Sequence, residues 1–204
     1  RVSGESGARF YIDKYLDTEL YQSPKVFTQC NRYIAEKIAE GINESVAGTA
    51  GEDTALFDIY CGTGIFTFLA GGDFGVRVGM DSERTAIDCA KSTVKRFGLE
   101  NTRFYRGRAE TGFRDVFERN KLENNIFIID PPRTGLDKSF LEWLKGIKGV
   151  RKVLYISCDP ARFSRDIKIM TDGGGWHLED VRLYDMFPRT RHVELLAEIK
   201  NVTG

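Results

Sequence analysis

Cysteine is sparse and scattered in this chain of 204 residues. Its four cysteines, Cys30, Cys61, Cys89 and Cys158, lie far apart and form no C-x-x-C pair. This spacing argues against a zinc site, a disulfide framework and an iron–sulfur cluster held by this chain. It fits a protein of the reducing cytoplasm, where thiols stay free.

Long apolar runs and an excess of charge of one sign are also lacking. No stretch approaches the ~20 apolar residues that cross a membrane, and no secretory signal pattern opens the chain. The 30 Lys and Arg residues are balanced by 30 Asp and Glu residues, whereas a dedicated nucleic-acid binder is usually basic overall. We therefore expect any contact with RNA or DNA to use a local patch or another domain.

The composition that remains is that of an ordinary globular domain, long enough for a full core. The chain begins at Arg1 and not at Met, as expected for a piece of a longer protein. Residues 1–26 are polar and lack clear periodicity, which predicts a linker or the remnant of an upstream domain. Residues 27–204 are predicted to form one domain.

Short runs of strand-forming residues alternate with helical patterns from residue 31 to residue 171. The predicted strands span 55–60, 76–81, 102–107, 125–130 and 152–157. The predicted helices span 31–41, 64–70, 82–97, 111–120, 138–147 and 161–171, with Gly41 ending the first and Ser82 capping the third. This alternation predicts an α/β fold with a mostly parallel sheet and helices on both faces. Two further strand patterns joined by a turn at Pro188 predict a C-terminal antiparallel hairpin.

The segment DIYCGTGIFTF carries the first chemical signal. A strand runs into Gly62 and Gly64, where glycines let the backbone approach a ligand closely. Asp81 ends the next strand, 17 residues after Gly64, close to the spacing at which an acid binds ribose hydroxyls in nucleotide-binding folds. Together they predict an adenosine-containing ligand, and the lack of a GK[ST] sequence excludes a triphosphate loop. A plain tight turn and a charge at a helix N-terminus are the structural alternatives.

Two more motifs end the strands that follow. Asp130 closes one strand before two prolines, at the edge of a parallel sheet where ligands bind. Arg133 comes next, a candidate for meeting a phosphate or a carbonyl oxygen. Cys158 ends the next strand just before a helix, where a thiol is expected to have a lowered pKa. Because consecutive strands are often neighbours, Asp130 and Cys158 are predicted to face one cleft. A stiff turn, a surface arginine and a small buried apolar residue are the alternatives.

Five segments, FTQCN, DIYCGTGIF, DPPRTGLD, YISCDP and YDMFPRTRHVE, occur in this order. Together they resemble the catalytic domain of the RNA uracil-5-methyltransferases, which make 5-methyluridine in transfer and ribosomal RNA with S-adenosylmethionine. The resemblance runs from about Phe27 to the C-terminus. It implies the Rossmann-like class I methyltransferase fold with seven strands, in agreement with the strand and helix pattern above.

The resemblance also implies roles for individual residues. Cys158 matches the nucleophile that adds to C6 of uracil, and Glu194 matches the base that removes the C5 proton. The implied cofactor-binding residues are Gln29, Tyr60, Gly62, Gly64, Asp81 and Asp130, and the implied substrate-binding residues are Phe27 and Arg133. Family members usually carry upstream RNA-binding and central domains, which residues 1–26 are too short to hold. We therefore expect this chain alone to bind the cofactor but to methylate RNA poorly.

Three residues depart from the family pattern. Ile65 stands where Asn is usual, and a contact to the methionine part of the cofactor is expected to be weakened or replaced. Asp159 also stands where Asn is usual, and its carboxylate is expected to disfavour the Cys158 thiolate unless a cation offsets it. Arg108 lies where many methyltransferases have a small acidic or amide side chain near the adenine.

The sequence leaves several functions open. YDMFPRTRHVE is more like the ribosomal RNA enzymes and FTQ more like the transfer RNA enzyme, and we prefer the ribosomal target. An amino-group methyltransferase of adenine or guanine would also place Asp-Pro-Pro here, but it usually adds an aromatic residue and needs no cysteine. A degenerate module that binds RNA or a protein without catalysis would explain Ile65 and Asp159.

Basic residues near the cleft are the candidates for RNA contact. The predicted basic rim consists of Arg162, Arg165, Lys168, Arg189 and Arg191. An ordinary solvated helix face is the alternative interpretation.

Overall fold

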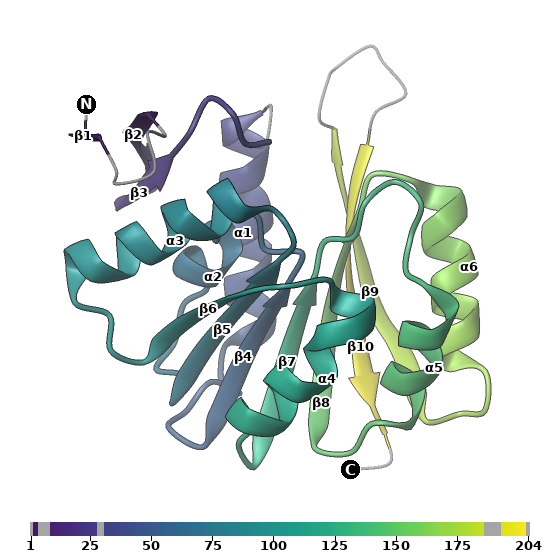
Figure 1. The fold of residues 1–204 in the computed structure, drawn as a ribbon. Helices are drawn as coiled ribbons and strands as arrows, with labels where there is room; N and C mark the ends of the chain where they lie inside the picture. The colour runs from purple at the N-terminus through teal and green to yellow at the C-terminus, as the bar shows by residue number, and fades with distance from the viewer. Residues whose placement is uncertain (1, 4–8, 28–30, 186–192, 203–204) are drawn as a thin grey trace.

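The computed structural model describes residues 2–3, 9–27, 31–185 and 193–202, and its main sheet has seven strands in the order β6-β5-β4-β7-β8-β10-β9 (Figure 1). The strands are β4 (Thr54–Ile59), β5 (Val76–Asp81), β6 (Thr102–Arg106), β7 (Asn124–Ile129), β8 (Val150–Ser157), β9 (Trp176–Asp185) and β10 (Val193–Asn201). β4 to β8 run parallel, while β10 is antiparallel to both β8 and β9. The predicted Rossmann-like fold and its C-terminal hairpin are confirmed.

Helices cover both faces of this sheet (Figure 1). One face carries α4 (Ala109–Asn120), α5 (Lys138–Gly146) and α6 (Pro160–Thr171), and the other carries α1 (Arg32–Val46), α2 (Ile65–Leu69) and α3 (Arg84–Phe97). Because the parallel strands all point the same way, the carboxyl ends of β4, β5, β7 and β8 meet at one edge. Among the described residues, none of the helices has both the length and the apolar character needed to cross a membrane.

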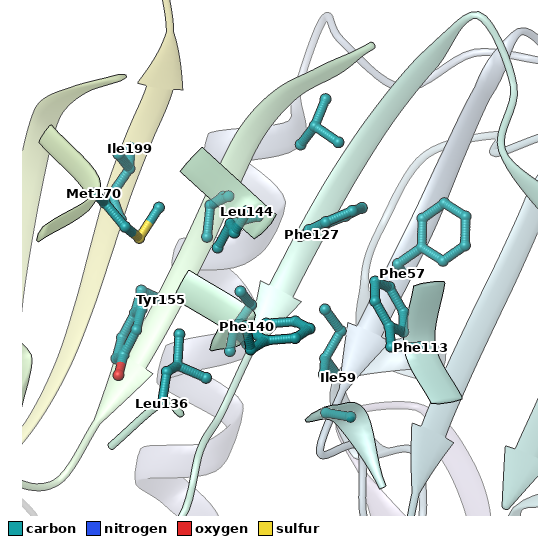
Figure 2. Close-up of a cluster of buried hydrophobic side chains, with 14 of the residues drawn as sticks. Phe57, Ile59, Phe113, Phe127, Leu136, Phe140, Leu144, Tyr155, Met170 and Ile199 are labelled. Atoms are coloured by element: carbon teal, nitrogen blue, oxygen red, sulfur yellow. The ribbon is translucent and has the colours of Figure 1, made fainter. Parts of the chain in front are cut away.

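Aromatic side chains fill the core between the sheet and α4, α5 and α6 (Figure 2). The rings of Phe57, Phe113 and Phe127 pack edge to face, with centroids 5.4–5.7 Å apart. Phe140 and Tyr155 extend this layer, and both side chains are buried. The residues that end β4, β7 and β8 are therefore anchored on a closely packed layer.

The N-terminal segment forms a second, three-stranded antiparallel sheet from β1 (Val2–Ser3), β2 (Arg9–Tyr15) and β3 (Thr18–Gln22). Tyr15 and Leu20 are buried in the same core cluster as α1 and α2. The N–H of Tyr21 donates to Thr93 Oγ1 of α3 at 3.0 Å. These strands were not predicted from the sequence, and the described part of the segment is packed onto the main domain. Whether residues 1–26 also derive from an upstream domain stays a prediction.

Helix α1 continues past Gly41, so the prediction that this glycine ends the helix is wrong. Gly41 is buried, and a Cβ built there lies 2.4 Å from Tyr184 Oη and 2.9 Å from Leu196 Cδ2. The glycine therefore allows α1 to approach β9 and β10 closely.

Replacing Gly41 with alanine is expected to destabilise the fold by about 1–3 kcal/mol, because the added methyl group overpacks a filled site. In an ordinary helix interior the same change stabilises by roughly 0.5–1 kcal/mol. Urea unfolding measures the effect, with Gly146→Ala in α5 as the control, since a Cβ built at Gly146 meets no atom within 4 Å. A Gly41→Ala variant as stable as the unchanged chain would show that Tyr184 and Leu196 make room without cost.

Candidate active site

A cavity of about 830 Å³ opens at the carboxyl edge of the sheet. Eight of the ten predicted site residues line it: Phe27, Tyr60, Gly62, Asp81, Asp130, Arg133, Cys158 and Glu194. Gly64 does not line the cavity, and Gln29 lies outside the described residues. The cavity is thus built from the loops that follow β4, β5, β6, β7 and β8, from Val26 and Phe27, and from the start of β10.

The turn after β4 needs glycine for two different reasons. Gly62 has φ +54°, and a Cβ built there meets no protein atom within 4 Å. Gly64 has φ +85°, and a Cβ there would lie 2.7 Å from the Phe104 ring. Gly62 therefore keeps the cavity side open, whereas Gly64 lets the turn pack against β6. Ile65, which departs from the family pattern, is buried in the core under this turn and does not line the cavity.

Asp81 joins the turn after β4 to the start of α3. Its Oδ2 accepts from the N–H of Gly62 at 2.9 Å, and its Oδ1 accepts from the N–H of Glu83 at 2.8 Å. A carboxylate has about four lone-pair sites, so both oxygens keep room for a hydroxyl donor. Glu83 is the N-cap of α3, accepting from the N–H of Thr85 at 3.0 Å, so the prediction of Ser82 as the cap is wrong.

Tyr60 and two residues of the α4 start form a polar wall of the cavity. Tyr60 has φ +65°, which is uncommon for a residue with a side chain. Its Oη donates to Glu110 Oε1 at 3.0 Å, while Arg108 Nε donates to Glu110 Oε2 at 3.5 Å. Burial and the Glu110 charge raise the pKa of Tyr60 well above its usual value. Glu110 was not among the predicted site residues, although its place just after a strand end was an available signal.

Strand pairing brings the candidate catalytic residues together. β7 and β8 are adjacent and parallel, with Ile129 opposite Tyr155, so Asp130 and Cys158 follow neighbouring strand ends. β10 pairs antiparallel with β8, and Leu195 lies opposite Ser157. Glu194 is one residue before Leu195, so it lies beside Cys158 on a strand that runs the opposite way, and both residues line the cavity.

Burial dominates the electrostatics of this group. It raises the pKa of Glu194 to about 7, although nearby Arg133 acts in the opposite direction. Burial and the charges of Glu194 and Asp81 raise the pKa of Asp130 to about 7. Burial also raises the pKa of Cys158 above its usual value, where Glu194 and Asp130 add to the effect and Arg133 opposes it. The expectation of a lowered pKa for Cys158 is therefore wrong.

Asp159, the second departure from the family pattern, caps the helix that follows Cys158. Its Oδ1 accepts from the N–H groups of Ala161 and Arg162 at 2.9 and 3.0 Å. Asn and Asp cap helices about equally well, which explains why an aspartate is tolerated here. Glu194 is the acid that raises the pKa of Cys158 most, so the concern about Asp159 is not supported by the structure.

The structure describes three of the five residues of the predicted basic rim. Arg162 and Lys168 are exposed on α6, whereas Arg165 pairs with the buried carboxylate of Asp166. Arg189 and Arg191 lie outside the described residues. Arg108 and Arg133 are the exposed cations that line the cavity itself.

A buried acid, Asp58, lies below the glycine turn. Its Oδ2 accepts from Thr67 Oγ1 at 2.5 Å, while its Oδ1 has no hydrogen-bond partner among the described residues. Burial is the main cause that raises its pKa from 3.8 to about 7. At pH values between these two, the unfolded chain has lost a proton that the folded protein keeps, so stability falls as pH rises from about 4 to about 7.

Replacing Asp58 with asparagine is expected to flatten this pH dependence, because the amide carries no ionisable proton. The unchanged chain should lose about 2–4 kcal/mol more than the variant between pH 5 and pH 8. Urea unfolding at both pH values measures the difference. Asp115→Asn, on the exposed side of α4, is the matched control. An equal decline in Asp58→Asn and in the unchanged chain would contradict the prediction.

Comparisons with known proteins agree with this geometry. The family model described as tRNA (uracil-5-)-methyltransferase matches residues 13–199. The chain is 30% identical over 203 residues to the tRNA (uracil(54)-C(5))-methyltransferase of Saccharomyces cerevisiae, covering 95% of this chain and 31% of that protein. It is 31% identical over 181 residues to the 23S rRNA (uracil(1939)-C(5))-methyltransferase of Francisella tularensis, and the match covers 88% of this chain and 39% of that protein.

A solved structure gives the same result. The tRNA (uracil-54, C5)-methyltransferase of Pyrococcus abyssi, in complex with S-adenosyl-L-homocysteine, superposes with a TM-score of 0.75 at 27% identity. The match covers 95% of this chain and 45% of that one. The chain spans less than half the length of the curated relatives that it matches. On the extent of the family match, the chain belongs to the tRNA (uracil-5-)-methyltransferase family.

Proposed function

We propose that this chain transfers a methyl group from S-adenosylmethionine to C5 of a uridine in RNA, through a covalent bond between Cys158 and C6 of the base. The observation that carries the proposal is that Cys158 and Glu194 reach one cavity from two strands. The reaction needs one nucleophile and one separate base, and these two side chains meet that need. Family membership supports uracil in RNA as the substrate.

The cavity fits the proposed cofactor in size and chemistry. Its volume of about 830 Å³ lies within the usual range for small-molecule sites. Gly62 leaves the wall open beside the Asp81 carboxylate, which suits ribose hydroxyls, and Tyr60 and Asp130 line the same space. Gln29 remains a proposed contact. When bound, S-adenosylmethionine supplies an electrophilic methyl group.

The side chains of this chain account for the remaining steps. The Cys158 thiolate adds to C6 of uracil, the C5–C6 double bond opens, and negative charge develops on the O4 carbonyl oxygen. Arg133 is the donor proposed to stabilise that oxygen. Once C5 carries the methyl group, the Glu194 carboxylate takes the C5 proton, the double bond re-forms and the Cys158 thiolate leaves. A pKa of about 7 suits Glu194 for accepting a proton near neutral pH.

The rate of turnover is expected to rise between pH 6 and pH 9. Below about pH 7 the Glu194 carboxyl is protonated and cannot accept the C5 proton. The pKa of Cys158 is raised, so the thiolate fraction continues to grow with pH across this range. Steady-state turnover at saturating cofactor and RNA measures the profile, because turnover requires removal of the C5 proton and release of Cys158. A flat profile from pH 6 to pH 9 would contradict the assignment of these two groups.

Phe27 is the residue proposed to contact the target base. Its side chain is 76% exposed, yet the residue lines the cavity. A base must leave its stack to reach the cavity, at a cost of a few kcal/mol. An exposed aromatic ring at the entrance offers a new stacking surface for the extruded base or its neighbour.

The direct test uses labelled S-adenosylmethionine with 23S ribosomal RNA and transfer RNA transcripts, followed by nucleoside mass spectrometry. We expect 5-methyluridine, with ribosomal RNA as the preferred substrate, and higher activity when the upstream part of the protein is present. 5-Methyluridine in transfer RNA alone would correct the target. Methylated adenine or guanine would instead favour an amino-group methyltransferase, and no product even from the full-length protein would favour a binding module.

A further inference from the structure

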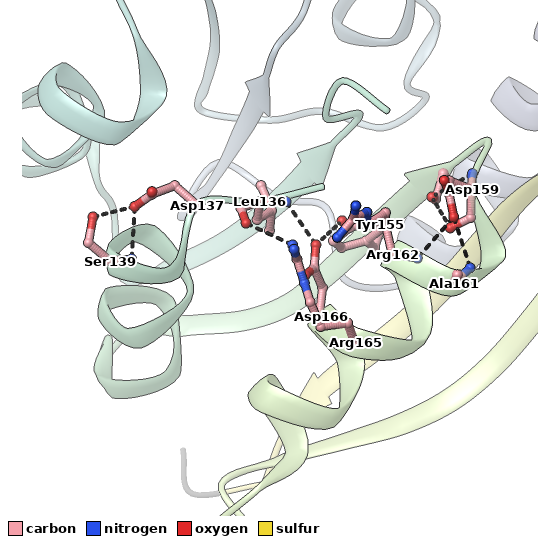
Figure 3. A network of polar contacts seen from close by, with 10 residues as sticks. Leu136, Asp137, Ser139, Tyr155, Asp159, Ala161, Arg162, Arg165 and Asp166 are labelled. Atoms are coloured by element: carbon pink, nitrogen blue, oxygen red, sulfur yellow. Dashed lines mark hydrogen bonds and ion pairs between the residues drawn. The ribbon is translucent and has the colours of Figure 1, made fainter. Parts of the chain in front are cut away.

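A buried carboxylate on α6 joins three segments around the candidate active site (Figure 3). Asp166 has no solvent exposure. Its Oδ2 accepts from Tyr155 Oη of β8 at 2.7 Å and from the backbone N–H of Leu136 at 2.8 Å. Its Oδ1 accepts from Arg165 Nε at 2.7 Å. Both oxygens are therefore used to hold neighbouring segments.

Arg165 completes the attachment of the loop that carries Arg133. Its Nη2 donates to the C=O of Leu136 at 2.9 Å, so both backbone polar groups of Leu136 are bound by α6 side chains. The preceding residue, Gly135, has φ +75°, and a Cβ built there would lie 2.6 Å from Arg165 Nη2 and 2.8 Å from Asp166 Oδ2. The loop thus lies directly against the Asp166–Arg165 pair, with no room for a larger residue.

The same pair is tied to Cys158 through the elements on either side of it. Tyr155 lies three residues before Cys158 in β8, and α6 begins at Pro160, two residues after it. On the loop side, the N–H of Gly135 donates to the C=O of Pro132 at 2.8 Å, which closes a turn with Arg133 at its second position. Hydrogen bonds therefore connect β8 and α6, the elements on either side of Cys158, to the turn that holds Arg133.

We infer that Asp166, held by Arg165, is a positioning residue that fixes Arg133 relative to Cys158. The effect of Asp166 on catalysis rests on the proposed function, whereas the hydrogen bonds that hold the loop do not. Three charged groups face Cys158 in the cavity: Arg133 and Asp130 from the loop after β7, and Glu194 from β10. Arg133 is the one that favours the thiolate, so a loop released from α6 should leave the thiol harder to ionise.

The test measures ionisation of Cys158 in the full chain without RNA or cofactor. Iodoacetamide labelling across pH 6–10, read by mass spectrometry of the Cys158 peptide, gives the midpoint of thiolate formation. We expect Asp166→Asn to move this midpoint up by about 1 pH unit, and Arg133→Gln to do the same. The double variant should show no further shift, because both changes remove the same interaction.

A second variant keeps the test decisive if Asp166→Asn does not fold. Arg165 is partly exposed, and Arg165→Gln breaks its bonds to Asp166 and Leu136. We expect this variant to raise the midpoint of Cys158 ionisation as Asp166→Asn does. In a chain that already carries Arg133→Gln, the same change should cause no further rise. Lys148→Gln, an exposed site after α5, controls for loss of one positive charge. An unshifted midpoint in folded Arg165→Gln, or a lowered melting temperature without a shift in Asp166→Asn, would overturn the inference. Failure of RNA methylation alongside a shifted midpoint would count against the proposed function only.

Discussion

Replacing Cys158 with alanine is expected to abolish formation of a covalent complex with RNA that contains 5-fluorouridine. Fluorine at C5 cannot leave as a proton, so the bond between Cys158 and C6 should persist once methyl transfer has occurred. In the unchanged protein, a protein–RNA band should survive a denaturing gel in the presence of S-adenosylmethionine. The variant should show no band and no methylation, because no other described thiol lines the cavity.

The matched control is Cys89→Ala, since Cys89 is buried against the N-terminal sheet and away from the cavity. It should give the same band as the unchanged protein. If Cys158→Ala methylated RNA at an undiminished rate, the covalent mechanism would be wrong and an amino-group target would become the better explanation. Because the chain spans less than half the length of the relatives that it matches, the test should be repeated with any longer form of the protein.

Replacing Glu194 with glutamine is expected to trap the protein on ordinary RNA. The amide cannot accept the C5 proton, so turnover should fall by about 10²–10⁴-fold. Formation of the covalent bond should not slow, because Glu194 raises the pKa of Cys158 and its removal favours the thiolate. A denaturing gel with unmodified RNA should therefore show a covalent band in the variant that the unchanged protein does not accumulate.

Glu179→Gln is the matched control for loss of a carboxylate. Glu179 lies on β9 and pairs with Lys200 at the protein surface, so turnover should be unaffected. Normal turnover in Glu194→Gln would assign the base to another residue. Asp130 would be the next candidate, since it lines the same cavity and its pKa is also raised to about 7.

The sequence predicted the main sheet well because its central strands β4, β5, β7 and β8 are buried on both faces and read as short apolar runs between turn residues. It failed where tertiary packing decides the outcome. Gly41 has the signature of a helix end but lies inside α1, because β9 and β10 press against it. Strand β2 was missed because the neighbours Tyr11 and Ile12 are both exposed, and β3 because Leu20, Tyr21 and Gln22 are all buried, so neither strand shows a clear alternation.

For the candidate site, topology made Asp130 and Cys158 predictable as neighbours, since each follows a strand of a parallel sheet. The partners of those residues were not predictable. Glu110 meets Tyr60 across 50 residues of sequence, and Asp166 meets Leu136 across 30. The pKa of Cys158 was predicted in the wrong direction because helix position is a local signal, whereas burial and Glu194 act through the folded structure.

The insertion of β10 between β8 and β9 means that the two halves of the cavity come from parts of the chain synthesised at different times. β4, β5 and β6 are neighbours in the sheet and precede β7 in the chain, so the wall with Gly62 and Asp81 comes from residues synthesised before Cys158 and Glu194. β9 has no partner in the described sheet except β10, which follows it in the chain. The Cys158 thiol is therefore synthesised before the strand that carries Glu194, and the two candidate residues come together only once β10 lies between β8 and β9.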